Sequence, residues 1–142
     1  MTESLTYNLH KLTARLDRAA DRILREREGV SYSRFLTLFA VKNGAGNQRA
    51  LAGWLGQSEP STSRMVGLLA GEGLLDVRRI PGAGNARHLQ LTAKGLDLVD
   101  RGGRLLEARF EELLERSGVS RASYQRQTRR LLDHLDGESQ PG

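Results

Sequence analysis

Apolar residues recur every three or four positions near the start of the chain. They are Leu5, Leu9, Leu12, Leu16, Ala19 and Ile23. This spacing places one apolar stripe along a helix, which we expect from about residue 6 to about residue 27. Gly29 is suited to ending that helix, and Ser31 is suited to capping a second helix that runs to about Val41.

The middle of the chain predicts two short helices followed by a β-hairpin. Glycine and asparagine cluster before the first of these helices and again between the two strands. The first strand is rich in branched apolar residues and arginine, and the second alternates between polar and apolar positions. In order, the expected elements are a loop at 43–47, helices at about 48–55 and 59–72, a strand at 75–80, a turn at 81–86 and a strand at 87–91.

A second apolar stripe with heptad-like spacing follows the hairpin. We expect Thr92 to cap a long helix that ends near Arg116, and Ser120 to cap a last helix. The stripe of the long helix consists of Leu96, Val99, Gly103, Leu106, Phe110 and Leu113, and the last helix carries Leu131, Leu132 and Leu135. Gly102 and Gly103 each lower the stability of a helix by about 1 kcal/mol, which indicates a close helix crossing or a bend.

The order of elements predicts a mainly α fold with a small β-hairpin wing (α+β). We expect a single domain over 1–142, with dimerisation helices at 5–30 and 93–136, a winged helix-turn-helix at 31–92 and a disordered tail at 137–142. A lone monomer would bury the stripes of the outer helices poorly, which favours packing between two subunits. The alternative is that the outer helices pack on each other within one chain.

The segment from Gln48 to Val66 is typical of a DNA-binding helix-turn-helix. Leu51 and Leu55 give its first helix an apolar face, and Ala52 permits close approach of the second helix. Gly56 suits the turn. Ser58 is suited to capping the second helix, with Glu59 and Pro60 in the first turn and with Thr62, Met65 and Leu69 facing inward.

This arrangement leaves four side chains at the exposed N-terminal end of the second helix. They are Pro60, Ser61, Ser63 and Arg64. Small hydroxyl side chains allow a helix to approach the major groove, and arginine bonds guanine edges or phosphate. The alternative is a pair of helices that pack together without binding DNA.

The hairpin after the second helix is typical of a wing. It carries Arg78, Arg79 and Arg87, and arginine at a wing tip is suited to a narrow minor groove. The alternative for Arg78 and Arg79 is solvation at the surface or pairing with Asp76.

Composition agrees with a nucleic-acid partner. The 142 residues carry a net charge of +5, and residues 42–94 account for +4 of it. A basic middle region attracts phosphate backbones or acidic partners. The chain has no cysteine, which excludes disulfides, thiolate zinc sites and thiol catalysis. We expect no membrane span and a cytoplasmic protein.

Other chemistries have weak support in the sequence. The glycine-rich stretches at 44–48 and 82–86 lack the third glycine of a dinucleotide-binding loop, and residues 56–60 lack the last glycine of a nucleophile elbow. His10, His88 and His134 lie far apart in the sequence, so we expect no metal site and expect imidazoles that face solvent. The alternative is a metal site at a dimer seam where His10 of the first helix and His134 of the last helix meet. We therefore expect no cofactor and no enzymatic activity.

Several motifs together resemble the MarR (multiple antibiotic resistance regulator) family. They are Ser58, Pro60-Ser-Thr-Ser-Arg-Met-Val66, Gly73-Leu-Leu75, Asp76-Val-Arg-Arg79, Asn85-Ala-Arg87 and Leu91-Thr-Ala-Lys-Gly95. The resemblance covers about residues 5–136, and its specificity comes from the order and spacing of the motifs. It departs at the wing, where Asn85 replaces an aspartate that commonly pairs with arginine in the family.

The resemblance implies an obligate homodimer whose first and last helices interlock. It also implies a repressor that binds a palindromic operator in double-stranded DNA and is released by a small, often aromatic, effector. Tyr32, Phe35 and Trp54 are the candidate ligand-binding residues.

Two other functions fit the sequence. They are a DNA-binding architectural protein that ignores ligands and a winged-helix module that binds proteins.

Overall fold

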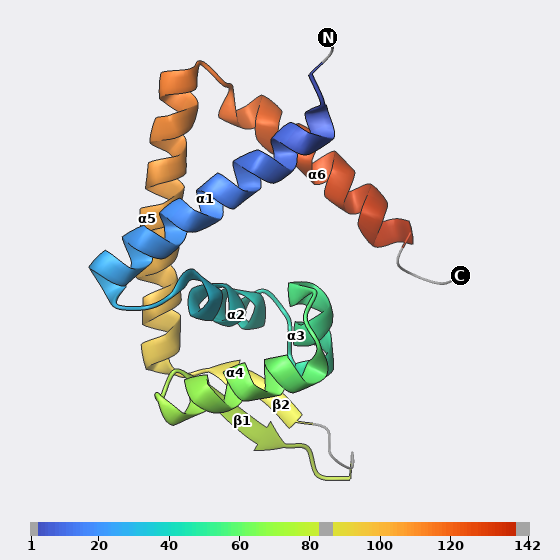
Figure 1. The fold of residues 1–142 in the computed structure, drawn as a ribbon. Helices are drawn as coiled ribbons and strands as arrows, with labels where there is room; N and C mark the ends of the chain where they lie inside the picture. Colours follow the sequence, from blue (N-terminus) through green and yellow to red (C-terminus); the bar gives the residue numbers. More distant parts are fainter. Residues whose placement is uncertain (1–2, 83–86, 139–142) are drawn as a thin grey trace. The chain divides into compact units, whose positions relative to one another are not determined.

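The computed structural model describes residues 3–82 and 87–138 and follows the predicted order of elements (Figure 1). The helices and strands are α1 (Leu5–Glu28), α2 (Tyr32–Lys42), α3 (Gln48–Leu55), α4 (Glu59–Gly71), β1 (Leu75–Arg79), β2 (Arg87–Leu91), α5 (Ala93–Ser117) and α6 (Arg121–Glu138). The mainly α fold with a two-stranded hairpin is confirmed. Two predicted ends are wrong: β1 ends at Arg79 and not at Ile80, and α6 continues through Gly137 to Glu138, into the expected tail.

Capping residues set the helix boundaries where the sequence predicts them. Gly29 ends α1 in the left-handed conformation, with φ 66°. The Ser31 hydroxyl accepts a hydrogen bond from the Arg34 N–H at 3.2 Å and begins α2. Thr92 performs the same task for α5, because its Oγ1 accepts a hydrogen bond from the Gly95 N–H at 3.0 Å.

The described residues form two compact units, and the boundary lies inside α5, between Gly103 and Arg104. The first unit contains α1 to α4, the hairpin and the first part of α5. Its core is built from leucine and valine side chains with no or almost no exposed area. These include Leu24, Leu38, Leu51, Val66, Leu69, Leu75 and Val99.

Two glycines allow α5 to pack closely within the first unit. A Cβ atom on Gly102 would lie 2.8 Å from a ring carbon of Phe35 and 3.1 Å from Leu24. A Cβ atom on Gly95 would overlap the backbone carbonyl of Leu74. Of the two explanations expected for Gly102-Gly103, a close crossing or a bend, Gly102 supports the close crossing, whereas a Cβ on Gly103 would meet nothing within 4 Å.

In the second unit the end of α5 contacts the start of α6. The rings of Phe110 and Tyr124 meet edge to face, with centroids 6.2 Å apart. Arg121 pairs with Glu107 at 3.2 Å. None of the described residues of α6 is buried, and its apolar side chains Leu131 and Leu132 are 64% and 46% exposed.

The stripe of α1 is also incompletely covered within the chain. Leu5 and Leu9 are 72% and 43% exposed, and Leu12 and Leu16 are half-buried. Among the described helices, none is both long enough and apolar enough to cross a bilayer.

Candidate nucleic-acid interface

The turn between α3 and α4 is built as the sequence predicts. Gly56 adopts φ 65° and ends α3, and the Ser58 hydroxyl accepts a hydrogen bond from the Ser61 N–H at 3.2 Å to begin α4. Thr62 has no exposed area, and its hydroxyl donates to the Ser58 carbonyl at 3.0 Å. These two hydrogen bonds fix the cap and the first turn of α4, and the buried side chains of Leu51 and Leu69 belong to the core that α3 and α4 share with the rest of the first unit.

The inward face of α4 differs from the prediction at one position. Thr62 and Leu69 are buried as expected, but Met65 is only half-buried and Val66 lies in the core with 2% exposure. The buried positions follow one another at spacings of four and three residues, which is the repeat of an α-helix. The inward stripe of α4 therefore passes through Val66 and not through Met65.

The opposite face of α4 presents the predicted DNA-binding residues. Pro60, Ser63 and Arg64 are exposed, and Ser61 is half-buried. The Arg64 guanidinium donates to the Ser61 hydroxyl at 3.2 Å, and that hydroxyl also accepts from Ser58 at 3.1 Å. These bonds hold the Arg64 side chain toward the N-terminal end of α4, where the helix dipole adds positive potential.

The wing is an antiparallel pair of strands in which Arg79 lies opposite Arg87 and Arg78 lies opposite His88. Because side chains alternate between the two faces of a strand, Arg79 and Arg87 share the face that carries Val77 and Leu89. Arg78 and His88 share the other face. The three predicted wing arginines therefore do not form one cluster.

Arg79 and Arg87 place two like charges at directly opposed positions, which is unfavourable in an isolated sheet. An anion between them would remove this repulsion, and the phosphate backbone of DNA supplies anions of the required kind. The hairpin is also tied to the body of the unit, since the Leu89 N–H donates to the Gly46 carbonyl at 2.9 Å.

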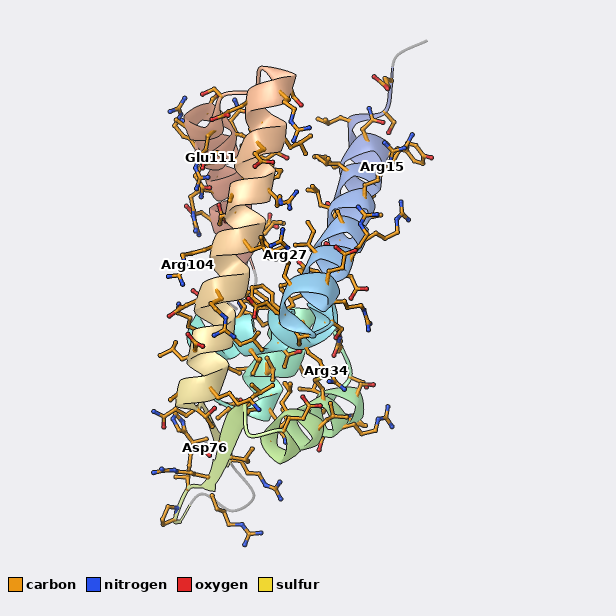
Figure 2. The ribbon with its side chains drawn as sticks, turned by 90° about the vertical axis from the view of Figure 1, so that its left-hand side faces the viewer. Arg15, Arg27, Arg34, Asp76, Arg104 and Glu111 are labelled. Carbon is orange, nitrogen blue, oxygen red and sulfur yellow. The ribbon has the colours of Figure 1, made fainter. Side chains whose placement is uncertain are left out.

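The arginines of this surface do not pair with carboxylates. Among the described residues, no ion pair involves Arg64, Arg78, Arg79 or Arg87. Asp76 lies on β1, beside these side chains in the sequence, yet within the described part of the chain it forms no ion pair with them (Figure 2). Figure 2 also shows long basic side chains that extend outward around the hairpin and α4. Their guanidinium groups are available to a partner.

One predicted feature of the wing lies outside the described residues. Asn85, which replaces the aspartate common in the family, belongs to the segment 83–86.

The three candidate ligand-binding residues lie in different environments. Phe35 is buried in the core and packs against Phe39, with ring centroids 5.9 Å apart. Trp54 is 51% exposed on α3, and Tyr32 is half-buried at the start of α2. Phe35 is thus occupied by core packing.

Tyr32 and Asp21 connect α2 to α1. The Tyr32 N–H donates to the Asp21 carboxylate at 2.9 Å, and Arg25 donates to the same carboxylate at 2.8 Å. These two hydrogen bonds hold the pKa of Asp21 below its ordinary value of 3.8. Burial, and to a smaller extent the charge of Asp17, raise the pKa of Tyr32 above its ordinary value of 10.0.

A cavity beside the wing was missed by the sequence analysis. It has a volume of about 590 Å³ and lies between the loop before α3, the start of α3, the first residue of α4 and the turn end of the hairpin strands. Its charged or titratable side chains are Arg49, Glu59, Arg87 and His88. The cavity forms because the loop before α3 contacts β2, and these two segments are far apart in the sequence. Only Gly44 and Gly46 indicate an unusual backbone path in the sequence of that loop.

Metal chemistry finds no support in the described residues. Within the ranges 3–82 and 87–138, no group of three or more histidine, aspartate and glutamate side chains is arranged to hold a metal ion.

Known proteins resemble this chain in structure. No protein-family model and no curated protein matches its sequence. A mutant of MarR from E. coli has a TM-score of 0.77 and 17% identity, over 95% of this chain and 98% of that one. A MarR/EmrR family transcriptional regulator from Acinetobacter sp. ADP1 has a TM-score of 0.75 and 17% identity, over 94% and 92%.

A third similar structure is a complex with DNA. MepR of Staphylococcus aureus, in that complex, has a TM-score of 0.73 and 18% identity, over 97% of this chain and 100% of that one. All three matches extend over nearly the whole of both chains, and MepR and the Acinetobacter protein are both described as transcription regulators. The chain therefore has the winged helix-turn-helix fold of the MarR family of transcription regulators.

Proposed function

We propose that this protein is a sequence-specific DNA-binding transcription regulator of the MarR type, and not an enzyme. The observation that carries the proposal is the set of unpaired arginines on α4 and the wing, in a fold whose solved examples include a complex with DNA. The N-terminal end of α4 would enter the major groove, and Arg87 would reach the adjacent minor groove.

The proposal includes a homodimer on a palindromic operator. Two copies of α4 related by a two-fold axis read two half-sites that lie about one helical turn apart. The exposed apolar side chains of α1 and α6 support this arrangement, because they would become buried between subunits.

Binding of duplex fragments from the region upstream of the protein's own gene tests the proposal. We expect one dimer per palindromic site, and an affinity that falls steeply with salt because arginine contacts release counterions from phosphate. Fluorescence anisotropy gives both quantities. Equal affinity for all duplexes would indicate an architectural protein, and no binding at low salt would indicate a module that binds proteins.

The dimer is tested separately by one charged substitution. Leu12→Asp places a charge in the stripe of α1, where an unpaired buried ion costs several kcal/mol. We expect sedimentation to show a monomer or an unfolded chain. Thr13→Asp is the matched control, because Thr13 is exposed one position away from the stripe. A stable dimer of the Leu12→Asp variant would contradict the arrangement.

We further propose that the regulator acts in the cytoplasm as a repressor and that a small ligand releases it from DNA. Oxidation of cysteine is not available to this chain. A thermal-shift screen of phenolic compounds, followed by duplex binding in the presence of each hit, tests ligand release. Hits that stabilise the protein and leave duplex affinity unchanged would argue against it.

A further inference from the structure

One face of α1 carries a row of positive charges. Its members are all exposed and recur every three or four positions, so they are neighbours on one side of the helix: Lys11, Arg15, Arg18 and Arg22. We call these four residues the basic stripe. With a rise of about 1.5 Å per residue, the basic stripe is about 16 Å long. Figure 2 shows nitrogen-tipped side chains that extend outward from α1 around Arg15.

The basic stripe is separate from the apolar stripe of the same helix. With about 3.6 residues per turn, the centres of the two stripes lie roughly 110° apart around α1. Burial of the apolar stripe in the proposed dimer therefore does not require burial of the basic stripe. The last helix, α6, which would pack against α1 in that dimer, carries four arginines and three acidic residues. It has no acidic excess that would neutralise the basic stripe.

Within the described residues, no acidic side chain forms an ion pair with the basic stripe. Two acidic residues on another side of α1 are used inside the fold. Asp21 accepts a hydrogen bond from the Tyr32 N–H at 2.9 Å, and Glu28 pairs with a residue of α5 at 3.1 Å. Glu26 lies one turn beyond the stripe and also forms no ion pair in the described part of the chain. The four cations are therefore available to a partner.

The basic stripe is distinct from the surface proposed for the operator. α1 packs against α2, and α4 and the hairpin lie on the other side of α2 (Figure 1). A duplex held by α4 and the wing is therefore on the side of the first unit away from α1. A polyanion on the basic stripe would be a second molecule or a distant segment of the same one.

The residue types favour the phosphate backbone of DNA as the partner. Three of the four cations are arginine, whose planar guanidinium donates paired hydrogen bonds to phosphate. Tyr7 lies one turn before Lys11 and is 66% exposed, and tyrosine is among the side chains that bond phosphate oxygens. Over the length of the stripe a duplex presents about ten phosphates. An anionic membrane fits less well, because helices that bind membranes insert their apolar face into lipid, and in the proposed dimer that face of α1 is buried.

We propose that the basic stripe binds the backbone of a second DNA segment, so that the protein bridges its operator to another duplex. Contacts to the backbone carry no sequence information, so the second segment needs no operator sequence. Bridging to an operator rests on the proposed function, whereas binding of DNA to the basic stripe does not.

A bridging experiment with the full-length protein tests the proposal. An operator duplex is fixed on beads, saturated with protein and washed, and the capture of a fluorescent duplex without an operator is then measured. The wild type should capture this second duplex. The stripe variant, Arg15→Gln/Arg18→Gln/Arg22→Gln, should lower capture at least about fivefold, because three phosphate contacts are lost. Its operator affinity should stay within about twofold of the wild type, because α4 and the wing are unchanged.

The matched control variant is Arg109→Gln/Arg126→Gln/Arg130→Gln. It removes the same total charge from exposed arginines that form no ion pair among the described residues. We expect it to capture the second duplex as the wild type does, and circular dichroism checks that both variants are folded. Unchanged capture in the stripe variant, or an equal loss in the two variants, would overturn the proposal.

A second measurement does not need an operator. Arg64→Gln/Arg79→Gln/Arg87→Gln removes cations of α4 and the wing, and the duplex binding that remains at low salt should come from the basic stripe. Adding the three stripe substitutions should raise the remaining Kd at least about fivefold and lower the slope of log K against log salt by about three. If the wild type prefers no operator and this remaining binding is still lost with the stripe, the proposed function fails and the stripe still binds DNA.

Vesicles of phosphatidylcholine and phosphatidylserine distinguish a membrane from DNA. We expect no difference in vesicle binding between the wild type and the stripe variant. If the wild type binds these vesicles, the stripe variant does not, and no second duplex is captured, then the basic stripe binds a membrane surface and the proposal is wrong.

Discussion

Two parts of the first unit differ in whether their positively charged side chains pair with carboxylates. On the side formed by α2 and the start of α5, cations pair with carboxylates: Arg34 with Glu72 at 2.8 Å and Lys42 with Asp100 at 2.6 Å. Arg101 pairs there with both Glu28 and Asp97. We call this the ion-paired side. On α4 and the wing, Arg64, Arg78, Arg79 and Arg87 have no such partner among the described residues.

The difference separates charges that connect elements of the fold from charges that are available to a ligand. Three pairs of the ion-paired side join different elements: Arg34–Glu72 joins α2 to the end of α4, Lys42–Asp100 joins α2 to α5, and Arg101–Glu28 joins α5 to α1. The arginines of α4 and the wing form no ion pair with another element among the described residues, and Arg79 lies opposite Arg87 across the hairpin. Net charge alone does not distinguish these two cases.

The largest expected effect concerns the ion-paired side and its close packing. Gly95→Ala should destabilise the protein by about 3 kcal/mol, because the new methyl group would overlap the Leu74 carbonyl at the start of α5. Urea unfolding measures the change. Gly103→Ala is the control: its methyl group would meet nothing within 4 Å, so it should stabilise α5 by up to about 1 kcal/mol. Equal stability of the two variants would show that α5 does not pack as described.

The next effect concerns the wing. Arg87→Ala should lower operator affinity by more than about tenfold, equivalent to about 1.4 kcal/mol, without lowering the free energy of unfolding, because it removes a like charge opposite Arg79. The loss should be greatest on sites with A·T-rich flanks, where the minor groove is narrow. Competition anisotropy with A·T-rich and G·C-rich flanks measures it. Wild-type affinity in this variant would show that the hairpin is not a DNA-binding wing.

A smaller effect is expected from breaking an ion pair. Arg101→Gln should lower stability by about 1 kcal/mol or less, since the Arg101 side chain is 46% exposed and its pairs are partly screened. Its effect on DNA affinity should be undetectable. A loss of affinity as large as that of Arg87→Ala would erase the distinction between the two regions.

The smallest effect depends on pH. The folded-state pKa of Asp21 is lowered, so its contribution to stability is present above pH 3.8 and is lost as the pH falls through the folded-state pKa. Asp21→Asn should therefore lie closer to the wild type in unfolding midpoint at about pH 2 than at about pH 6. The same difference at both pH values would show that the carboxylate charge has no role at this position.

The sequence predicted the elements well because their boundaries are set locally. Ser31, Ser58 and Thr92 cap helices through hydrogen bonds to residues three positions later, and Gly29 and Gly56 end helices in the left-handed conformation. Such signals lie within one turn of helix and are visible in the sequence. The fold class follows from their order.

The candidate site was predicted less completely because its geometry is not local. The strand register places Arg79, and not Arg78, opposite Arg87, and this depends on which residues pair across the hairpin. Val66, and not Met65, lies in the core, because the packing of α4 against the rest of the first unit decides which side of the helix turns inward. The cavity needs contact between the loop before α3 and β2, which no local pattern predicts.

The salt dependence of duplex binding tests the central claim, which is that unpaired arginines bind DNA phosphate and paired cations do not. Two variants remove one positive charge each: Arg79→Gln from the wing and Lys42→Gln from the ion-paired side. We predict that the slope of log K against log salt becomes shallower by about one for Arg79→Gln and stays at the wild-type value for Lys42→Gln. Equal slopes in the two variants would contradict the account.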